Sequence, residues 1–396
     1  MITTGVTGGR WRASVTPWGA VEPWDGSPAL DWHVAADDRW HTPRDESTVR
    51  QKRLGGTAVV ETRVRIPEGE AVQRVYSVAD HGGLTVVEVE NASTLPIAIA
   101  FTRGDVLTAR PPTAPIEGIE LPIGSIAVPV GHTATATVAL AHDGRGAGTL
   151  PGGLPTATSV VRGWSTLTER ASRLLLPDAP LGPRVVAARC ELLLGGPLHP
   201  DLDPVGFLLG VGDLVRLGDA AEPWLPDVAH AIEIAAKGDV RDWSLGAALD
   251  AAARVLVSAG DTRALRDLAA LRARVVRPCS LPVDEPADVA RFVAWVERRL
   301  AQPSVGCAEL LPAGVPREWA GSNFEVYGLP TGATSTVSYA VRWHGARPAV
   351  LWEQSGDATE LTAPAIDPEW RTTHTTGETL WPVPPGFDPG EGVSFG

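Results

Sequence analysis

The hydrophobic periodicity of the chain changes twice, from a period of 2 to one of about 3.6 and back to 2. In the first region, residues 58–141, Val60 and Val64 alternate with charged residues such as Glu61. Short alternating runs of this kind are typical of half-buried strands, and turn residues rather than helices separate them. Residues 1–150 are therefore predicted to form an N-terminal antiparallel β-sandwich.

A segment rich in glycine and proline at residues 144–155 predicts a linker, and the period after it is that of a helix. The expected helices have proline in their first turn and glycine directly after their last turn. Because the connections are short, neighbouring helices are expected to run antiparallel. We predict about seven helices, stacked as αα-hairpins in an incomplete toroid, over residues 151–304. The first covers residues 160–174, and the others are predicted to begin at Pro183, Pro204, Pro226, Ser244, Asp261 and Pro286.

The period of 2 returns in the C-terminal part of the chain. Tyr339 and Val341 alternate with Ala340, which predicts paired strands in a C-terminal β-segment over residues 305–371. Residues 372–396 are polar and rich in proline and glycine, which predicts a tail. The expected fold class is a multidomain α+β protein in which β, α and β regions follow one another.

The composition argues against two classes of partner. Lysine and arginine number 34 against 47 acidic residues, which gives a net charge of −13. Nucleic-acid binding and adhesion to anionic membranes both need a basic surface, so neither partner is expected. The three cysteines are far apart and form no CxxC pair, which favours a reducing compartment over a disulfide framework. No apolar run has the length of a membrane span or a secretory signal, so a cytoplasmic location is predicted.

No cofactor or metal site is expected. The phosphate-binding GxxxxGK[ST] loop and the zinc-binding HExxH motif are absent from the sequence. Gly210 and Gly212 lack the third glycine of a dinucleotide fingerprint and are interpreted as a place of close helix packing. Residues 33–41 contain two histidines and two aspartates, the one dense cluster of metal-capable side chains. Their neighbours do not favour a helix that would align them, and a surface loop is the preferred interpretation.

Tryptophan is abundant, with 14 residues against 3 tyrosines and 6 phenylalanines. The flat face of an aromatic ring can stack on the apolar face of a sugar ring. Several tryptophans fall on apolar stripes and are expected in the core. Trp224, Trp243 and Trp319 lie off these stripes, in helix-entry loops or in the junction segment 316–327, and are the predicted substrate-binding residues.

Two carboxylates are candidates for catalysis in such a site. Asp242 stands at the mouth of a predicted helix, where the loops of stacked hairpins form a concavity, and Glu325 lies in the junction segment. An inverting glycosidase needs one protonated and one ionised carboxyl group about 6.5–9.5 Å apart. Asp242 and Glu325 are the predicted pair on position alone. The alternative for each is a solvated or helix-capping carboxylate.

The order of the parts and the sequences of the strands resemble the α-toroid glycoside hydrolases, the glucoamylase-like or six-hairpin group. The resemblance rests on the segments VVETRVRIPEGEAVQRVYSV and LTVVEVENASTLPIAIAF, which precede the helical hairpins. A third segment, VSYAVRWHGARPAVLWE, is similar to a C-terminal β-segment of actinobacterial proteins with this organisation. In that group a sandwich precedes a barrel of six αα-hairpins whose loops hold two catalytic carboxylates. The resemblance implies a carbohydrate-active protein but assigns no catalytic residue to a position in this sequence.

The helical region is too short for a complete ring, because twelve helices with their loops need about 250 residues and only about 145 are present. Three functions stay open. The chain is a carbohydrate-active protein that acts as an inverting glycosidase, a non-catalytic glycan-binding or protein-interaction scaffold that has lost the catalytic hairpins, or an unrelated helical enzyme or binding module. An incomplete ring leaves apolar helix faces that need cover, so a homo-oligomer or a protein partner is a further expectation.

Overall fold

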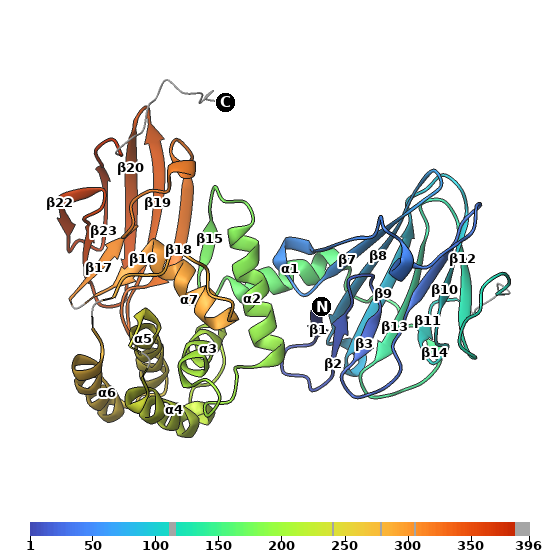
Figure 1. Cartoon of the computed structure of the whole chain (residues 1–396), viewed down its shortest axis with the longest axis horizontal. Coiled ribbons are helices and arrows are strands. Elements are labelled where there is room, and N and C mark those ends of the chain that lie inside the picture. The colour runs from blue at the N-terminus through green and yellow to red at the C-terminus, as the bar shows by residue number, and fades with distance from the viewer. Residues whose placement is uncertain (111–115, 240, 278, 305, 385–396) are drawn as a thin grey trace. The chain divides into compact units, whose positions relative to one another are not determined.

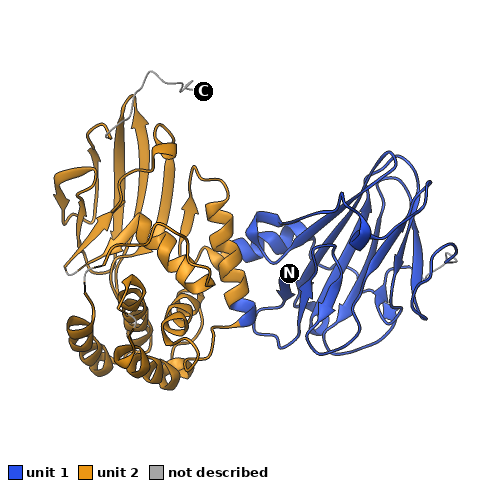
Figure 2. Ribbon diagram, viewed as in Figure 1, with its two compact units in different colours: residues 1–165, 193–195 blue, residues 166–192, 196–396 orange. Residues whose placement is uncertain are grey.

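The computed structural model describes residues 1–110, 116–239, 241–277, 279–304 and 306–384. The chain divides into two compact units, shown in Figure 2. Unit 1 comprises residues 1–165 and 193–195, and unit 2 comprises residues 166–192 and 196–396. Residues 151–165 and 193–195 of the predicted helical region belong to unit 1, whereas the rest of that region lies with the C-terminal β-segment in unit 2.

Unit 1 contains the predicted antiparallel β-sandwich (Figure 1), in which only the short outermost pair β11–β14 is parallel. The seven-stranded sheet has the spatial order β14 (Gly148–Thr149), β11 (Leu107–Thr108), β13 (Thr135–Ala141), β9 (Leu84–Asn91), β8 (Gly69–Val78), β7 (Val60–Ile66) and β6 (Arg50–Arg53). The four-stranded sheet has the order β12 (Ile126–Val130), β10 (Ile97–Phe101), β4 (Trp32–Ala35) and β5 (Trp40–His41). A small sheet contains β1 (Ile2–Gly5), β2 (Arg12–Val15) and β3 (Val21–Pro23).

The alternating pattern of the sequence explains the core of unit 1. Val60 lies opposite Val75, Val75 opposite Val87, and Val87 opposite Val138, so one row of valines crosses four strands. Each of the four is at most 1% exposed, and they belong to a core that includes Trp32 of the four-stranded sheet. Burying a valine side chain contributes about 1.5–3 kcal/mol. A register slip of one residue would turn the row toward the opposite face, so burial fixes the strand pairing.

Unit 2 contains two sheets. The first has the order β15 (Arg173–Leu175), β18 (Phe324–Pro330), β19 (Thr336–His344), β20 (Arg347–Ser355) and β23 (Thr376–Leu380). The second has the order β16 (Ala301–Pro303), β17 (Cys307–Leu310), β21 (Glu360–Ala363) and β22 (Asp367–Thr372), with β17 and β21 parallel. The prediction of a tail over residues 372–396 was wrong in part. Residues 376–380 form strand β23, whose backbone pairs with β20, and the following Trp381 is fully buried. Residues 385–396 of that tail lie outside the described residues.

The described residues contain seven α-helices, as predicted. Their bounds are α1 (Ala157–Thr168), α2 (Leu181–Gly195), α3 (Pro204–Leu217), α4 (Leu225–Lys237), α5 (Trp243–Ser258), α6 (Thr262–Val275) and α7 (Val289–Leu300). Several helix bounds were predicted wrongly, since α2 begins at Leu181 rather than Pro183 and α7 begins at Val289 rather than Pro286. The first helix ends at Thr168, and Leu174 lies in strand β15 because it pairs with Val326. Helix α5 begins at Trp243 rather than Ser244, because the Asp242 side chain caps it by accepting a hydrogen bond from the backbone N–H of Ser244.

Helices α3, α5 and α7 run parallel. The first turn of α7 contacts the N-cap of α3 through Arg291 and Asp203, and the last turns of both helices meet through Glu297 and Arg216. An added Cβ at Gly212 of α3 would lie 2.6 Å from the Cβ of Ala251 of α5, closer than real Cβ atoms approach. The interpretation of Gly212 as a place of close helix packing is confirmed. None of the described helices is both long and apolar enough to cross a membrane.

Candidate functional site

A cavity of about 220 Å³ lies in unit 2 beside helix α7. Three parts of the chain form its walls: the segment before α2 with the first residue of that helix, the C-terminal half of α7, and the loop after β17. The apolar lining residues are Leu181, Val296, Leu300, Leu311, Ala313, Pro316 and Trp319. The volume is below the range of about 300–1,000 Å³ for drug-sized ligands, so the cavity suits one small ring rather than a chain of rings.

The loop after β17 has a strained backbone at the cavity wall. Leu311 has a φ of 47°, in the left-handed region that residues with a Cβ rarely adopt, and it is 1% exposed. Its N–H donates to the carbonyl of Leu300, and its own carbonyl accepts from Gly314 at 2.7 Å. Such a conformation costs about 1–3 kcal/mol and persists because the surrounding structure holds it.

Three charged side chains line the same cavity: Asp178, Arg299 and Glu318. Within the described part of the chain, none of them forms a hydrogen bond or an ion pair through its side chain. The Arg299 guanidinium lies over the ring of Trp295, 4.6 Å from its centroid, which holds the cation beside the cavity. Two carboxylates and one guanidinium are therefore available to a polar ligand.

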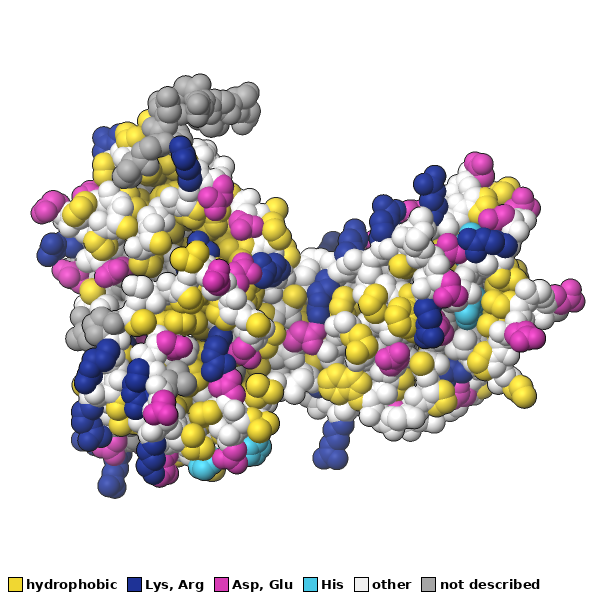
Figure 3. Space-filling model, viewed as in Figure 1, with side chains coloured by type: hydrophobic (Ala, Val, Ile, Leu, Met, Phe, Trp, Pro, Cys, Tyr) yellow, Lys and Arg dark blue, Asp and Glu magenta, His cyan; other side chains and the backbone are white. Residues whose placement is uncertain are grey.

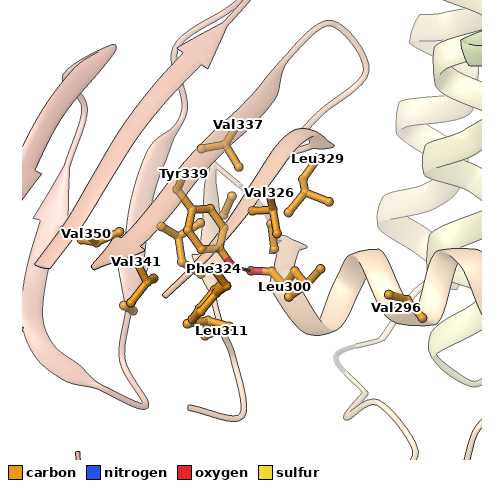
Figure 4. Packing of buried hydrophobic residues seen from close by; sticks show 14 of the residues in the cluster. Val296, Leu300, Leu311, Phe324, Val326, Leu329, Val337, Tyr339, Val341 and Val350 are labelled. Carbon is orange, nitrogen blue, oxygen red and sulfur yellow. Dashed lines mark hydrogen bonds between the residues drawn. The ribbon is translucent and has the colours of Figure 1, made fainter. Parts of the chain in front are cut away.

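Trp319 is the one predicted substrate-binding residue that lines the cavity. It closes a short 3-10 helix, Arg317–Trp319, and its ring meets the edge of Phe324 at 5.3 Å. Only 5% of Trp319 is exposed, so it forms part of the wall rather than an open stacking platform. Figure 4 shows how Leu300, Leu311 and Phe324 pack in the adjoining core, where the Tyr339 hydroxyl donates to the Leu300 carbonyl at 3.0 Å.

The other two predicted tryptophans are not among the residues that line the cavity. Trp224 is half-buried and meets Phe207 of α3 edge to face at 6.1 Å. Trp243 opens α5 and packs against both apolar cores of unit 2. Both side chains therefore have structural contacts that explain their positions.

The predicted catalytic carboxylates have protein partners of their own. Oδ1 of Asp242 accepts hydrogen bonds from the backbone N–H and the hydroxyl of Ser244, at 2.8 and 2.6 Å. Glu325, on strand β18, accepts hydrogen bonds from the Arg342 guanidinium and the Tyr327 hydroxyl. Neither carboxylate lines the cavity, and no hydrogen bond among the described residues joins one to the other. A capping role for Asp242 agrees with the alternative considered for it from the sequence.

The sequence missed Asp178 and Arg299 as site residues. Asp178 lies between Pro177 and Ala179 just before α2, and its backbone carbonyl accepts the N–H of Leu181 at 3.1 Å. The one available signal was a carboxylate in a proline-rich helix entry. Arg299 follows a second arginine near the end of α7, where cations are common because they complement the helix dipole. Glu318 belonged to the junction segment singled out beside Trp319.

The histidine and aspartate cluster of residues 33–41 is part of the β4–β5 region of unit 1. His41 is buried and its two ring nitrogens lie 2.9 Å from Asp38 and 3.0 Å from Glu46. His33 instead contacts the hydroxyl of Thr42. Among the residues that the structure describes, no group of three or more histidine, cysteine or acidic side chains is placed to hold a metal ion.

Acidic and basic side chains are interspersed on the face of each unit seen in Figure 3, so neither face has charge of one sign only.

A scan against protein-family models and a search of curated proteins found no match to the chain. We therefore infer the function from the chemistry of the cavity.

Proposed function

We propose that the protein binds carbohydrate and that the cavity beside Trp319 takes one sugar ring. The observation that carries the proposal is an apolar lining combined with three charged side chains that form no hydrogen bond or ion pair with the described residues, Asp178, Arg299 and Glu318. A sugar ring has apolar C–H faces and hydroxyl groups around its edge. Carboxylates accept hydrogen bonds from hydroxyls and a guanidinium donates to them, so the lining matches both parts of the ring.

The contacts of Asp242 and Glu325 favour binding over hydrolysis by that pair. Asp242 serves as a helix cap and Glu325 is held by Arg342, so neither carboxylate is free to act on a ligand in the cavity. Hydrolysis is the second candidate function. One observation favours it, namely that two unpaired carboxylates, Asp178 and Glu318, line one cavity.

The proposed location is the cytoplasm, as expected from the sequence. Cys190, Cys279 and Cys307 are all free thiols, which agrees with a reducing compartment. An assembly with a second copy or another protein stays part of the proposal, and a size measurement in solution tests it.

A panel of monosaccharides, α-glucans and aryl glycosides tests the proposal. Tryptophan fluorescence reports binding, and an assay for released sugar in the same samples reports hydrolysis. The variant Ala313→Trp places a large ring at the cavity wall and is expected to abolish binding. Ala229→Trp, at an exposed position of α4, is the matched control. No fluorescence change and no released sugar across the panel would contradict the proposed function.

A further inference from the structure

A group of buried charges lies on the C-terminal halves of the parallel helices α3 and α7. Arg189 of α2 is 1% exposed and donates to Asp213 at 3.1 Å and to Glu297 at 2.8 Å. Arg216 donates to both carboxylate oxygens of Glu297, at 2.8 and 2.9 Å, and to Asp213 at 3.2 Å. Two guanidinium groups therefore neutralise two carboxylates, and this part of the cluster has no net charge.

The neighbouring part of the cluster has more positive than negative charge. Asp250 of α5 accepts a hydrogen bond from Arg272 of α6 at 2.6 Å and another from Arg298 of α7 at 2.5 Å. One carboxylate faces two guanidinium groups, which leaves one positive charge in excess. The side chains of Asp250 and Arg298 are only 15% and 12% exposed, so water screens this excess poorly.

Arg254 adds a second unbalanced positive charge. It lies one turn after Asp250 on α5, and its Nε is buried with no hydrogen-bond partner. Within the described residues, its guanidinium forms no ion pair either. Burial, followed by the charge of Arg216, lowers the pKa of Arg254 to about 10, so the group is still a cation at neutral pH. Arg254 as a whole is only half-buried, so part of the residue is in contact with solvent.

The ends of the helices explain part of this arrangement. The carbonyl ends of α3, α5 and α7 have partial negative charge, which stabilises cations in the last turns. A helix dipole acts mainly within its last turn, however, and provides no acceptor for the Nε–H of Arg254. A buried donor without an acceptor costs about 1–3 kcal/mol. An acceptor with negative charge would satisfy both the donor and the excess charge.

We infer that Arg254, together with Arg298, binds a small oxyanion, a phosphate or a carboxylate group. Guanidinium groups present paired N–H donors that match the oxygen spacing of both anions. The anion would accept from Arg254 and offset the two excess positive charges of the cluster. This site is separate from the cavity beside Trp319, because the two have no lining residue in common. The inference therefore does not depend on the proposed function.

Calorimetric titration of the full chain tests this inference. Inorganic phosphate and acetate are titrated separately at constant ionic strength set with chloride, so that the two oxyanions are distinguished from each other and from a salt effect. We expect saturable binding of one of them at a single site. Arg254→Gln is expected to weaken that binding about tenfold or more, since it removes charge-assisted hydrogen bonds. Arg266→Gln, at an exposed position of α6, is the control and is expected to bind as the wild type does.

Arg254→Lys keeps the positive charge and serves as a second variant in case Arg254→Gln does not fold. It is expected to bind more weakly than the wild type, because an ammonium group cannot make the paired contact. Saturable binding that is equal in the wild type and both variants would overturn the inference. Absence of saturable binding by both oxyanions would also overturn it. The role of the arginines would then be limited to their favourable interaction with the C-terminal ends of the helices. Ala313→Trp, which blocks the sugar cavity, is expected to leave anion binding unchanged.

Discussion

Arg216 of α3 and Glu297 of α7 are joined by two hydrogen bonds of 2.8 and 2.9 Å in the interior of unit 2. Burial would raise the pKa of Glu297, but Arg216 and Arg189 outweigh it and hold this pKa well below its usual range. The Ser172 hydroxyl also donates to the carboxylate, at 2.7 Å. A single ionised side chain therefore connects α7 to α2, α3 and the segment before β15.

Replacing this carboxylate is expected to destabilise unit 2. Glu297→Gln keeps the size of the side chain but leaves Arg189 and Arg216 with one buried negative charge fewer. Removing one partner of a buried ion pair lowers the free energy of unfolding by about 3–5 kcal/mol. Urea denaturation followed by tryptophan fluorescence measures this loss. Glu233→Gln, which removes an exposed pair with Lys237, is the control and should change the unfolding free energy by less than about 0.5 kcal/mol. Equal effects of the two substitutions would show that the buried charge is not important for stability.

Alanine substitution at two helical glycines is expected to change the stability of the protein in opposite directions. Gly212→Ala places a methyl group 2.6 Å from Ala251, so α3 and α5 must separate, and overpacking of this kind costs about 1–3 kcal/mol. Gly163→Ala, at an exposed position of α1, meets no atom within 4 Å and is expected to gain about 0.5–1 kcal/mol from its better helix propensity. Thermal unfolding of the two variants measures the difference. Stabilisation by Gly212→Ala would contradict the close approach of α3 and α5.

The stability of unit 1 is expected to fall as the pH decreases from about 6.5 to 4. Burial, followed by the charge of Arg12, lowers the pKa of His142 from 6.5 to about 4. The ring stacks on Trp11, with centroids 4.2 Å apart, and its Nε2 lies 2.9 Å from the Thr85 hydroxyl. Between the two pKa values the unfolded chain binds more protons than the folded chain, so the unfolding free energy rises with pH. The stabilisation is complete above pH 6.5 and is lost as the pH falls toward 4.

Urea denaturation at several pH values between 4 and 7 checks this dependence. His142→Gln is expected to flatten the pH profile in this window, although not completely, because burial also lowers the pKa of His33 in the same unit. His344→Gln, at an exposed position of unit 2, is the control and should leave the profile as it is. A profile unchanged by His142→Gln would show that another group causes the acid sensitivity.

The elements with strong periodicity could be predicted from the sequence. The alternation around Val60 and Val64 requires one buried face, and proline before and glycine after α3 determine its ends. Strands β15 and β23 were not predicted, because their sequences do not alternate and the strands are stabilised by pairing with neighbours far away in the chain.

The candidate site could be predicted only in part. Trp319 was predicted as a binding residue because it lies off the apolar stripes, in the junction segment 316–327, and that segment also contains Glu318. Asp178 and Arg299 are more than 100 residues apart in the sequence, and only the packing of α2 against α7 brings them to one cavity. Asp242 and Glu325 were chosen by position, which does not reveal that Ser244 and Arg342 occupy their oxygens.

The cavity beside Trp319, rather than the Asp242 and Glu325 pair, is the proposed sugar site. Its most direct test is a comparison of dissociation constants for the best sugar of the panel. Asp178→Asn and Glu318→Gln are each expected to weaken binding about tenfold or more, because a hydrogen bond to a charged group contributes about 1.5–3 kcal/mol. Asp242→Asn and Glu325→Gln are expected to bind as the wild type does. Wild-type affinity in the first two variants, with weaker binding in the last two, would contradict the claim.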